Sequence, residues 1–80
     1  MLHLNDIMTI NPEILGGQPV FKGSRVPVES LFDFLESGET LDNFLDNFPT
    51  VDREKAIALL EIASKLMTSE NIIKLYEAAA

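Results

Sequence analysis

The stretch Gly16–Val28, GGQPVFKGSRVPV, decides how this chain folds. It places two short runs of β-branched and aromatic residues on either side of a glycine-containing turn, which is typical of a β-hairpin. Proline cannot donate a hydrogen bond to a strand ladder, so the two prolines of the stretch mark strand ends or a sheet edge. The residues expected to shape this motif are Gly16, Gly17, Pro19, Gly23 and Pro27.

The residues before this stretch extend the β-rich arm. Residues 7–10 (IMTI) are short, apolar and partly β-branched, which favours a strand. Asn11-Pro12 ends that strand, because proline pushes the preceding residue out of the helical region. Glu13–Leu15 is long enough for one helical turn, and Gly16-Gly17 is expected to be a turn or hinge.

After the stretch, the hydrophobic period changes to that of helices. Apolar residues recur at i, i+3, i+4 and i+7 from Val28, which predicts a helix over 28–37, and Gly38 is the expected left-handed stop. The same spacing from Leu41 predicts a second helix over 41–48, with Thr40 as its N-cap.

Two more helices follow. Asp52 is the expected N-cap of a helix over 53–67 that is apolar over more than half its circumference and should therefore be central. Thr68-Ser69 breaks the pattern and can cap a last helix over 69–79. The sequence thus predicts one domain over residues 1–80 that is mainly α. It combines a β-arm or hairpin at 7–27, a helix-turn-helix-like three-helix bundle at 28–67 and a C-terminal helix.

Size and composition limit how the domain is stabilised. The chain has 80 residues, 46% of them hydrophobic, and no cysteine, so neither disulfides nor thiolate metal sites can contribute. A domain this small buries only about 60% of the surface that its unfolded chain exposes. An exposed two-stranded unit is also marginal alone. We therefore expect a homodimer.

Charge is distributed unevenly. The net charge is −7, which opposes binding to the polyanion nucleic acid. Residues 29–52 carry seven acids and no base, and this acidic block is either a solvated outer face or a footprint for a basic partner. The N-terminus lacks the pattern of a signal peptide, and no apolar run approaches a membrane span, so we expect a cytoplasmic protein that binds no membrane.

Catalytic and metal-binding patterns are missing from the sequence. His3 is the sole histidine and lies in the terminal arm. The carboxylates lack the clustered loop that calcium needs, and the glycines do not form a phosphate-binding loop. We therefore expect no catalytic residues, no metal, no cofactor and no enzyme activity.

The candidate contacts to nucleic acid are basic residues. A helix-turn-helix would read DNA with one of its last two helices, but the outer face of 41–48 is Asp and Asn, and that of 53–67 is a poor groove reader. Lys22 and Arg25 are better placed to hold backbone phosphates, and Arg53 lies near the start of the third helix. Alternatively, Arg25 is structural and pairs with a carboxylate such as that of Glu29.

The last helix is amphipathic. Its apolar residues fit either a core or dimer element, or a helix that docks in the groove of a partner. The candidate partner-binding residues are Ile72, Ile73, Leu75 and Tyr76.

The segment Thr9–Ala63 resembles the family catalogued as domain of unknown function 433. The resemblance rests on the run from Thr9 to Val28, TINPEILGGQPVFKGSRVPV, and on the helix starts and stops at Ser37-Gly38, Phe48-Pro49 and Asp52-Arg53-Glu54. It covers about two-thirds of the chain.

The resemblance implies a small bacterial helix-turn-helix protein with a β-hairpin arm. Many members are classed as antitoxins, so it implies a chain that binds and silences a PIN-like ribonuclease toxin and represses its own operon as a complex. Two departures matter: Gln18 stands where a basic residue is common, and the expected reading surface is acidic. The alternatives are a stand-alone DNA-binding regulator and a structural dimerisation module.

Overall fold

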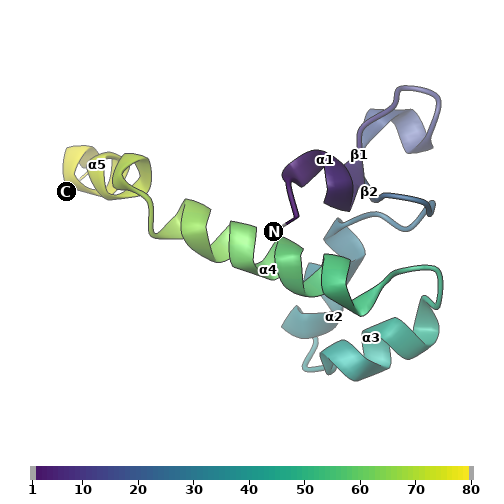
Figure 1. Ribbon diagram of the computed structural model, residues 1–80. Helices are drawn as coiled ribbons and strands as arrows, with labels where there is room; N and C mark the ends of the chain where they lie inside the picture. The colour runs from purple at the N-terminus through teal and green to yellow at the C-terminus, as the bar shows by residue number, and fades with distance from the viewer. Residues whose placement is uncertain (1, 80) are drawn as a thin grey trace.

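A computed structural model describes residues 2–79, which are mainly helical with one small antiparallel sheet, as the sequence predicts. A β-arm leads into three packed helices, and the last helix lies at the far end of the third (Figure 1). The elements are α1 (Leu4–Ile7), β1 (Met8–Thr9), a 3-10 turn (Leu15–Gly17), β2 (Val20–Phe21), α2 (Glu29–Glu36), α3 (Leu41–Asn47), α4 (Arg53–Met67) and α5 (Glu70–Ala79).

The sheet joins β1 to β2, with Met8 opposite Phe21 and Thr9 opposite Val20. This corrects the expected hairpin within Gly16–Val28, because the run RVPV forms only an isolated bridge between Val20 and Pro27. Val28 still donates its N–H to the Pro19 carbonyl at 3.0 Å, but Pro19 has no N–H to return the bond, so the pairing stops there. The two runs still lie together, because the Phe21 N–H donates to the Val26 carbonyl at 2.9 Å.

The turn between these runs is held by Ser24. Its hydroxyl donates to the Phe21 carbonyl at 2.8 Å and accepts from the Val26 N–H at 3.1 Å. Gly23 has a φ of +82°, a left-handed value that favours glycine. The expected helical turn before this region is displaced, since the 3-10 turn begins at Leu15 and takes in Gly16 and Gly17.

The ends of α2 and α3 are those that the sequence predicts. At the end of α2, Gly38 has a φ of +89°, and its N–H donates to the Leu35 carbonyl at 3.1 Å. The Glu39 N–H reaches back to the Phe34 carbonyl at 2.9 Å, which completes a Schellman motif. Thr40 caps α3 by accepting from a backbone N–H through its side chain.

The core lies where the arm meets the three helices. Ile7, Phe21 and Leu31 are completely buried, and Phe44 of α3 sits at the centre of an aromatic cluster. The Phe44 ring centroid is 5.0–6.0 Å from the centroids of three other rings, those of Phe21, Phe34 and Phe48. The sheet, α2 and α3 therefore meet on one side chain.

Helix α4 is central only over its first half, which corrects the expectation that it is central throughout. Ala56 and Leu59 are buried, whereas Leu66 and Met67 are exposed because α4 extends beyond the bundle (Figure 1). Asp52 occupies the N-cap position, but its side chain makes no capping hydrogen bond.

The short helix α1 lies where the sequence indicated only a terminal arm. The His3 N–H donates to the Asp6 carboxylate at 2.9 Å, and Ile7 closes the core from this side. Four residues are too few to show a helical period, so this element was missed.

Candidate interaction surfaces

The largest group of exposed apolar side chains lies at the C-terminal end of the molecule. We call it the C-terminal face. Its members are between 50% and 75% exposed and comprise five of the nine large apolar residues that the structure leaves exposed. They are Leu66, Met67, Ile73, Leu75 and Tyr76.

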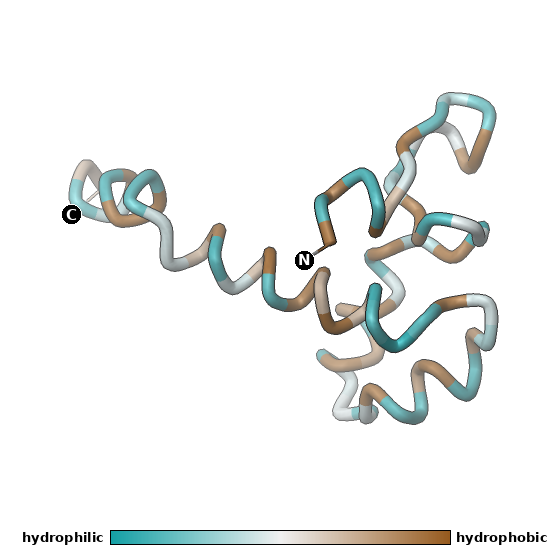
Figure 2. The backbone as a smooth tube through the Cα atoms, in the orientation of Figure 1, coloured by the Kyte–Doolittle hydropathy of each residue, from teal (hydrophilic) through white to brown (hydrophobic). Residues whose placement is uncertain are grey.

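This face continues the hydrophobic core. The stripe of α4 that buries Ala56 and Leu59 runs on through Leu66, because residues seven apart lie on the same side of a helix. Figure 2 shows hydrophobic positions recurring along α4 and again in α5. The bundle covers the first half of the stripe, and the second half is exposed to solvent.

Hydrogen bonds at the joint fix α5 to the end of α4. The Thr68 hydroxyl donates to the Ser64 carbonyl at 2.9 Å, which caps α4. The Ser69 hydroxyl donates to the Leu66 carbonyl at 2.8 Å and accepts from the Ile72 N–H at 3.3 Å. The predicted break at Thr68-Ser69 is therefore confirmed as a cap on both sides.

Helix α5 presents all four predicted partner-binding residues without burying any of them. Ile72 is half-buried, and Ile73, Leu75 and Tyr76 are exposed. The alternative that α5 belongs to the core of its own chain is therefore wrong. Lys74 and Glu70 form an exposed ion pair at 3.8 Å, one helical turn apart.

The predicted nucleic-acid contacts lie at the opposite end of the molecule, where four of the six basic residues gather. We call this group the cationic corner. The Lys55 ammonium donates to the Lys22 carbonyl at 3.2 Å, which joins the start of α4 to the turn. Lys55 was not predicted, because 33 residues separate it from Lys22. The corner consists of Lys22, Arg25, Arg53 and Lys55.

These four side chains differ in how many ion pairs and hydrogen bonds they make. Within residues 2–79, Arg25 is exposed and makes no ion pair, so the alternative in which it pairs with a carboxylate such as that of Glu29 is wrong. Arg53 pairs with the Asp42 carboxylate of α3, and the Lys55 ammonium lies 3.4 Å from the Asp52 carboxylate. The Lys22 ammonium donates to the Asn5 carbonyl at 3.0 Å. Arg25 is thus the least engaged cation of the corner.

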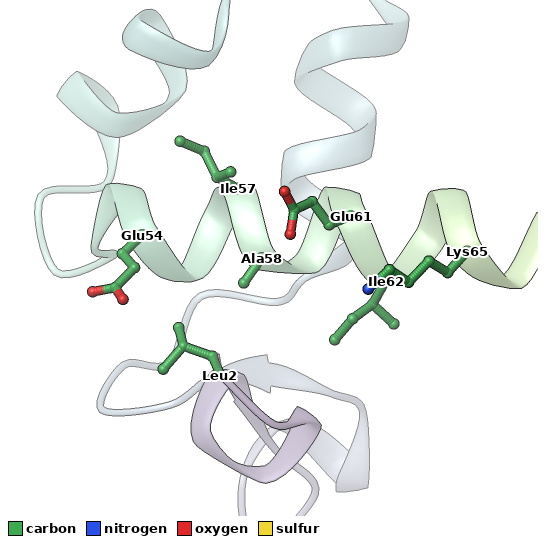
Figure 3. A pocket seen from close by; sticks show the side chains of 7 residues that line it. All are labelled: Leu2, Glu54, Ile57, Ala58, Glu61, Ile62 and Lys65. Carbon is green, nitrogen blue, oxygen red and sulfur yellow. The ribbon is translucent and has the colours of Figure 1, made fainter.

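A small hollow lies between the N-terminal residues and α4 (Figure 3). Ala58 and Ile62 turn toward Leu2, and Glu54, Glu61 and Lys65 lie around them. Its volume of about 230 Å³ is below the roughly 300 Å³ at which ligand pockets begin. In the described part of the chain, no three acidic or histidine side chains gather as a metal site would need. None of the helices within residues 2–79 has both the length and the apolar character of a membrane span.

The family described as "Protein of unknown function (DUF433)" matches residues 8–63, well over half of the chain. The chain belongs to the DUF433 family. A curated relative, "Uncharacterized protein y4eO" from Sinorhizobium fredii (strain NBRC 101917 / NGR234), is 40% identical over 50 residues, which are 62% of this chain and 23% of the relative. The match thus spans about a quarter of that relative's length. No solved structure matches the chain.

One of the two candidate surfaces lies inside the region that matches DUF433, and the other lies outside it. The region 8–63 contains the sheet, the turn and all four residues of the cationic corner. The C-terminal face begins at Leu66 and lies outside it. The DUF433 region therefore supplies the buried core of residues 2–79 except for Ile7, and the exposed apolar face belongs to the segment that follows.

Proposed function

We propose that this protein is an antitoxin-like interaction protein that binds and neutralises a cognate PIN-like ribonuclease in the cytoplasm. It acts by binding, and the C-terminal face makes the contact. The resemblance to antitoxin-like proteins supports the class of partner.

The observation that carries this proposal is the bare apolar stripe on α4 and α5. Contiguous exposed apolar surface on a small protein marks an interaction site, because leaving it in water is unfavourable. An amphipathic helix that lays its apolar face into a groove is a common way of binding a protein. Helix α5 has that form, and none of its residues is buried.

Charge supports the same class of partner. An enzyme that acts on RNA needs positive surface for a polyanionic substrate. This chain carries a net charge of −7, and its acidic block lies mainly in α2 and α3. Opposite charge on two proteins accelerates their encounter and favours the correct partner. The acidic block would steer the encounter, and the C-terminal face would hold the complex.

Co-expression with the ribonuclease encoded by an adjacent gene tests the proposal. We expect the wild type to restore growth, and Leu75→Glu to fail while retaining the helical circular dichroism of the wild type. Glutamate favours helix as leucine does, and Leu75 is 66% exposed, so the substitution changes the face and leaves the fold.

The matched control is Ile10→Glu. Ile10 is 61% exposed and directly follows β1, which lies on the other side of the molecule from α5 (Figure 1). It should restore growth as well as the wild type. Equal restoration of growth by Leu75→Glu and Ile10→Glu would show that the C-terminal face does not bind the ribonuclease. If the wild type does not restore growth, the proposed function itself is wrong.

A DNA contact made by the complex is a second candidate, favoured by the cationic corner. The corner holds four of the six Lys and Arg residues of the chain, two of them paired with carboxylates, and assembly with a basic ribonuclease would add positive charge. We expect binding to the chain's own promoter in gel shifts of the complex, with affinity that falls as salt rises. Arg25→Gln should weaken it, and promoter binding that is insensitive to this substitution would exclude the corner.

A further inference from the structure

A single chain exposes more solvent-accessible surface than a compact monomer of the same mass. The accessible area is 5691 Å² for 8.9 kDa. A compact monomer of this mass exposes about 4,800 Å². The radius of gyration is also larger than expected: it is 14.1 Å, whereas a compact chain of this length has about 12 Å. The extension of α4 and α5 beyond the bundle accounts for this shape (Figure 1).

The excess area matches the size of a protein interface. It amounts to about 900 Å², and each partner in a stable complex loses about 800 Å². The bare stripe is also continuous with the buried stripe of α4, which is the character of an obligate interface that resembles a divided core. One more polypeptide on this face would therefore give the chain the exposed area of an ordinary folded protein.

We infer that a second copy of this chain covers the C-terminal face when the ribonuclease is absent, so that self-association and ribonuclease binding exclude one another. The competition rests on the proposed function, whereas the self-association does not. Two copies would meet through the same residues on each, as a two-fold axis requires.

The placement of charge favours a second copy as the occupant. Glu70 and Lys74 already pair with each other on α5, so these two charges need no partner from the second copy. The acidic block lies mainly in α2 and α3, at the other end of the molecule from α5 (Figure 1). Two copies joined at their C-terminal faces keep these blocks apart, which limits the repulsion between two chains of net charge −7.

Sedimentation velocity of the full chain over a wide concentration range tests the self-association. We expect a species of twice 8.9 kDa that dissociates on dilution. Leu75→Glu should weaken dimerisation by about tenfold or more, because it places a charge on the apolar face. Ile10→Glu should sediment as the wild type does. A wild-type monomer at high concentration, or equal dimerisation of Leu75→Glu and the wild type, would overturn the inference.

The competition has its own readout. When the ribonuclease is added to the dimer, we expect a complex with one copy of this chain for each binding site, and loss of the homodimer. A complex that retains the homodimer joined at its C-terminal faces would contradict the competition. Failure of the neutralisation assay with a dimer still present would remove the proposed function and leave the self-association standing.

Discussion

At the scale of single residues, Phe44 connects the parts of the fold. Its ring lies 6.0 Å from that of Phe21 in the sheet and 5.5 Å from that of Phe34 in α2. Phe44→Ala removes these contacts and leaves a cavity, so we expect a loss of about 3–5 kcal/mol in the free energy of unfolding. Urea denaturation measures it. Ile10→Ala, at an exposed site, should change stability by less than about 0.5 kcal/mol, and a similar loss in both variants would contradict this account of the core.

Gly38 is required for the backbone and not for packing. No atom lies within 4 Å of the position that a Cβ would occupy, yet φ is +89°. Gly38→Ala should therefore cost about 1 kcal/mol of stability through backbone strain alone. Gly38→Asn should cost less, because asparagine tolerates the left-handed region. Thermal unfolding of the two variants checks the order, and a neutral alanine variant would refute it.

At the scale of elements, two helix starts differ in a way that stability measurements can detect. The Thr40 hydroxyl accepts from the Asn43 N–H at 3.0 Å, whereas Asp52 makes no such bond at the start of α4. Thr40→Ala should cost about 1 kcal/mol. Asp52→Ala removes an ion pair between this exposed carboxylate and the partly buried Lys55, so it should cost less. The reverse order in chemical denaturation would show that the capping contact is not what stabilises α3.

The elements that the sequence predicts well are those set by local signals. Helices α2, α3 and α4 combine an apolar period with a cap, and their observed bounds lie within a residue or so of the predicted ones. The strand pairing was not predictable in the same way. Met8 pairs with Phe21 across the intervening loop, whereas the nearer run RVPV adds only a single bridge between Val20 and Pro27.

The candidate surfaces were also predictable only where local sequence signals define them. The apolar stripe of α5 is visible as a period in the sequence, so Leu75 and Tyr76 could be named from it. Whether that stripe packs against its own bundle depends on the path of α4, which no local pattern encodes. The position of Lys55 beside Lys22 could not be predicted from the sequence, because only the fold brings the two residues together.

At the scale of the whole molecule, the two candidate surfaces lie at opposite ends. The cationic corner joins the turn to the start of α4, and the C-terminal face lies on the end of α4 and on α5. Substitutions on one surface should therefore leave the other intact, since distant sites that share no contacts act additively. We expect Arg25→Gln to leave self-association unchanged in sedimentation, and a monomeric Arg25→Gln variant would show that the surfaces are coupled.

The central claim is that the C-terminal face is a protein contact and not a solvated end, and Tyr76 tests it most directly. The chain has one tyrosine and no tryptophan, so its tyrosine emission reports Tyr76 alone, a side chain that is 75% exposed in the single chain. The measurement is acrylamide quenching of this emission over a dilution series. The account predicts that quenching falls as concentration rises and follows the dimer fraction. Quenching as efficient as that of a free tyrosine derivative at every concentration would contradict it.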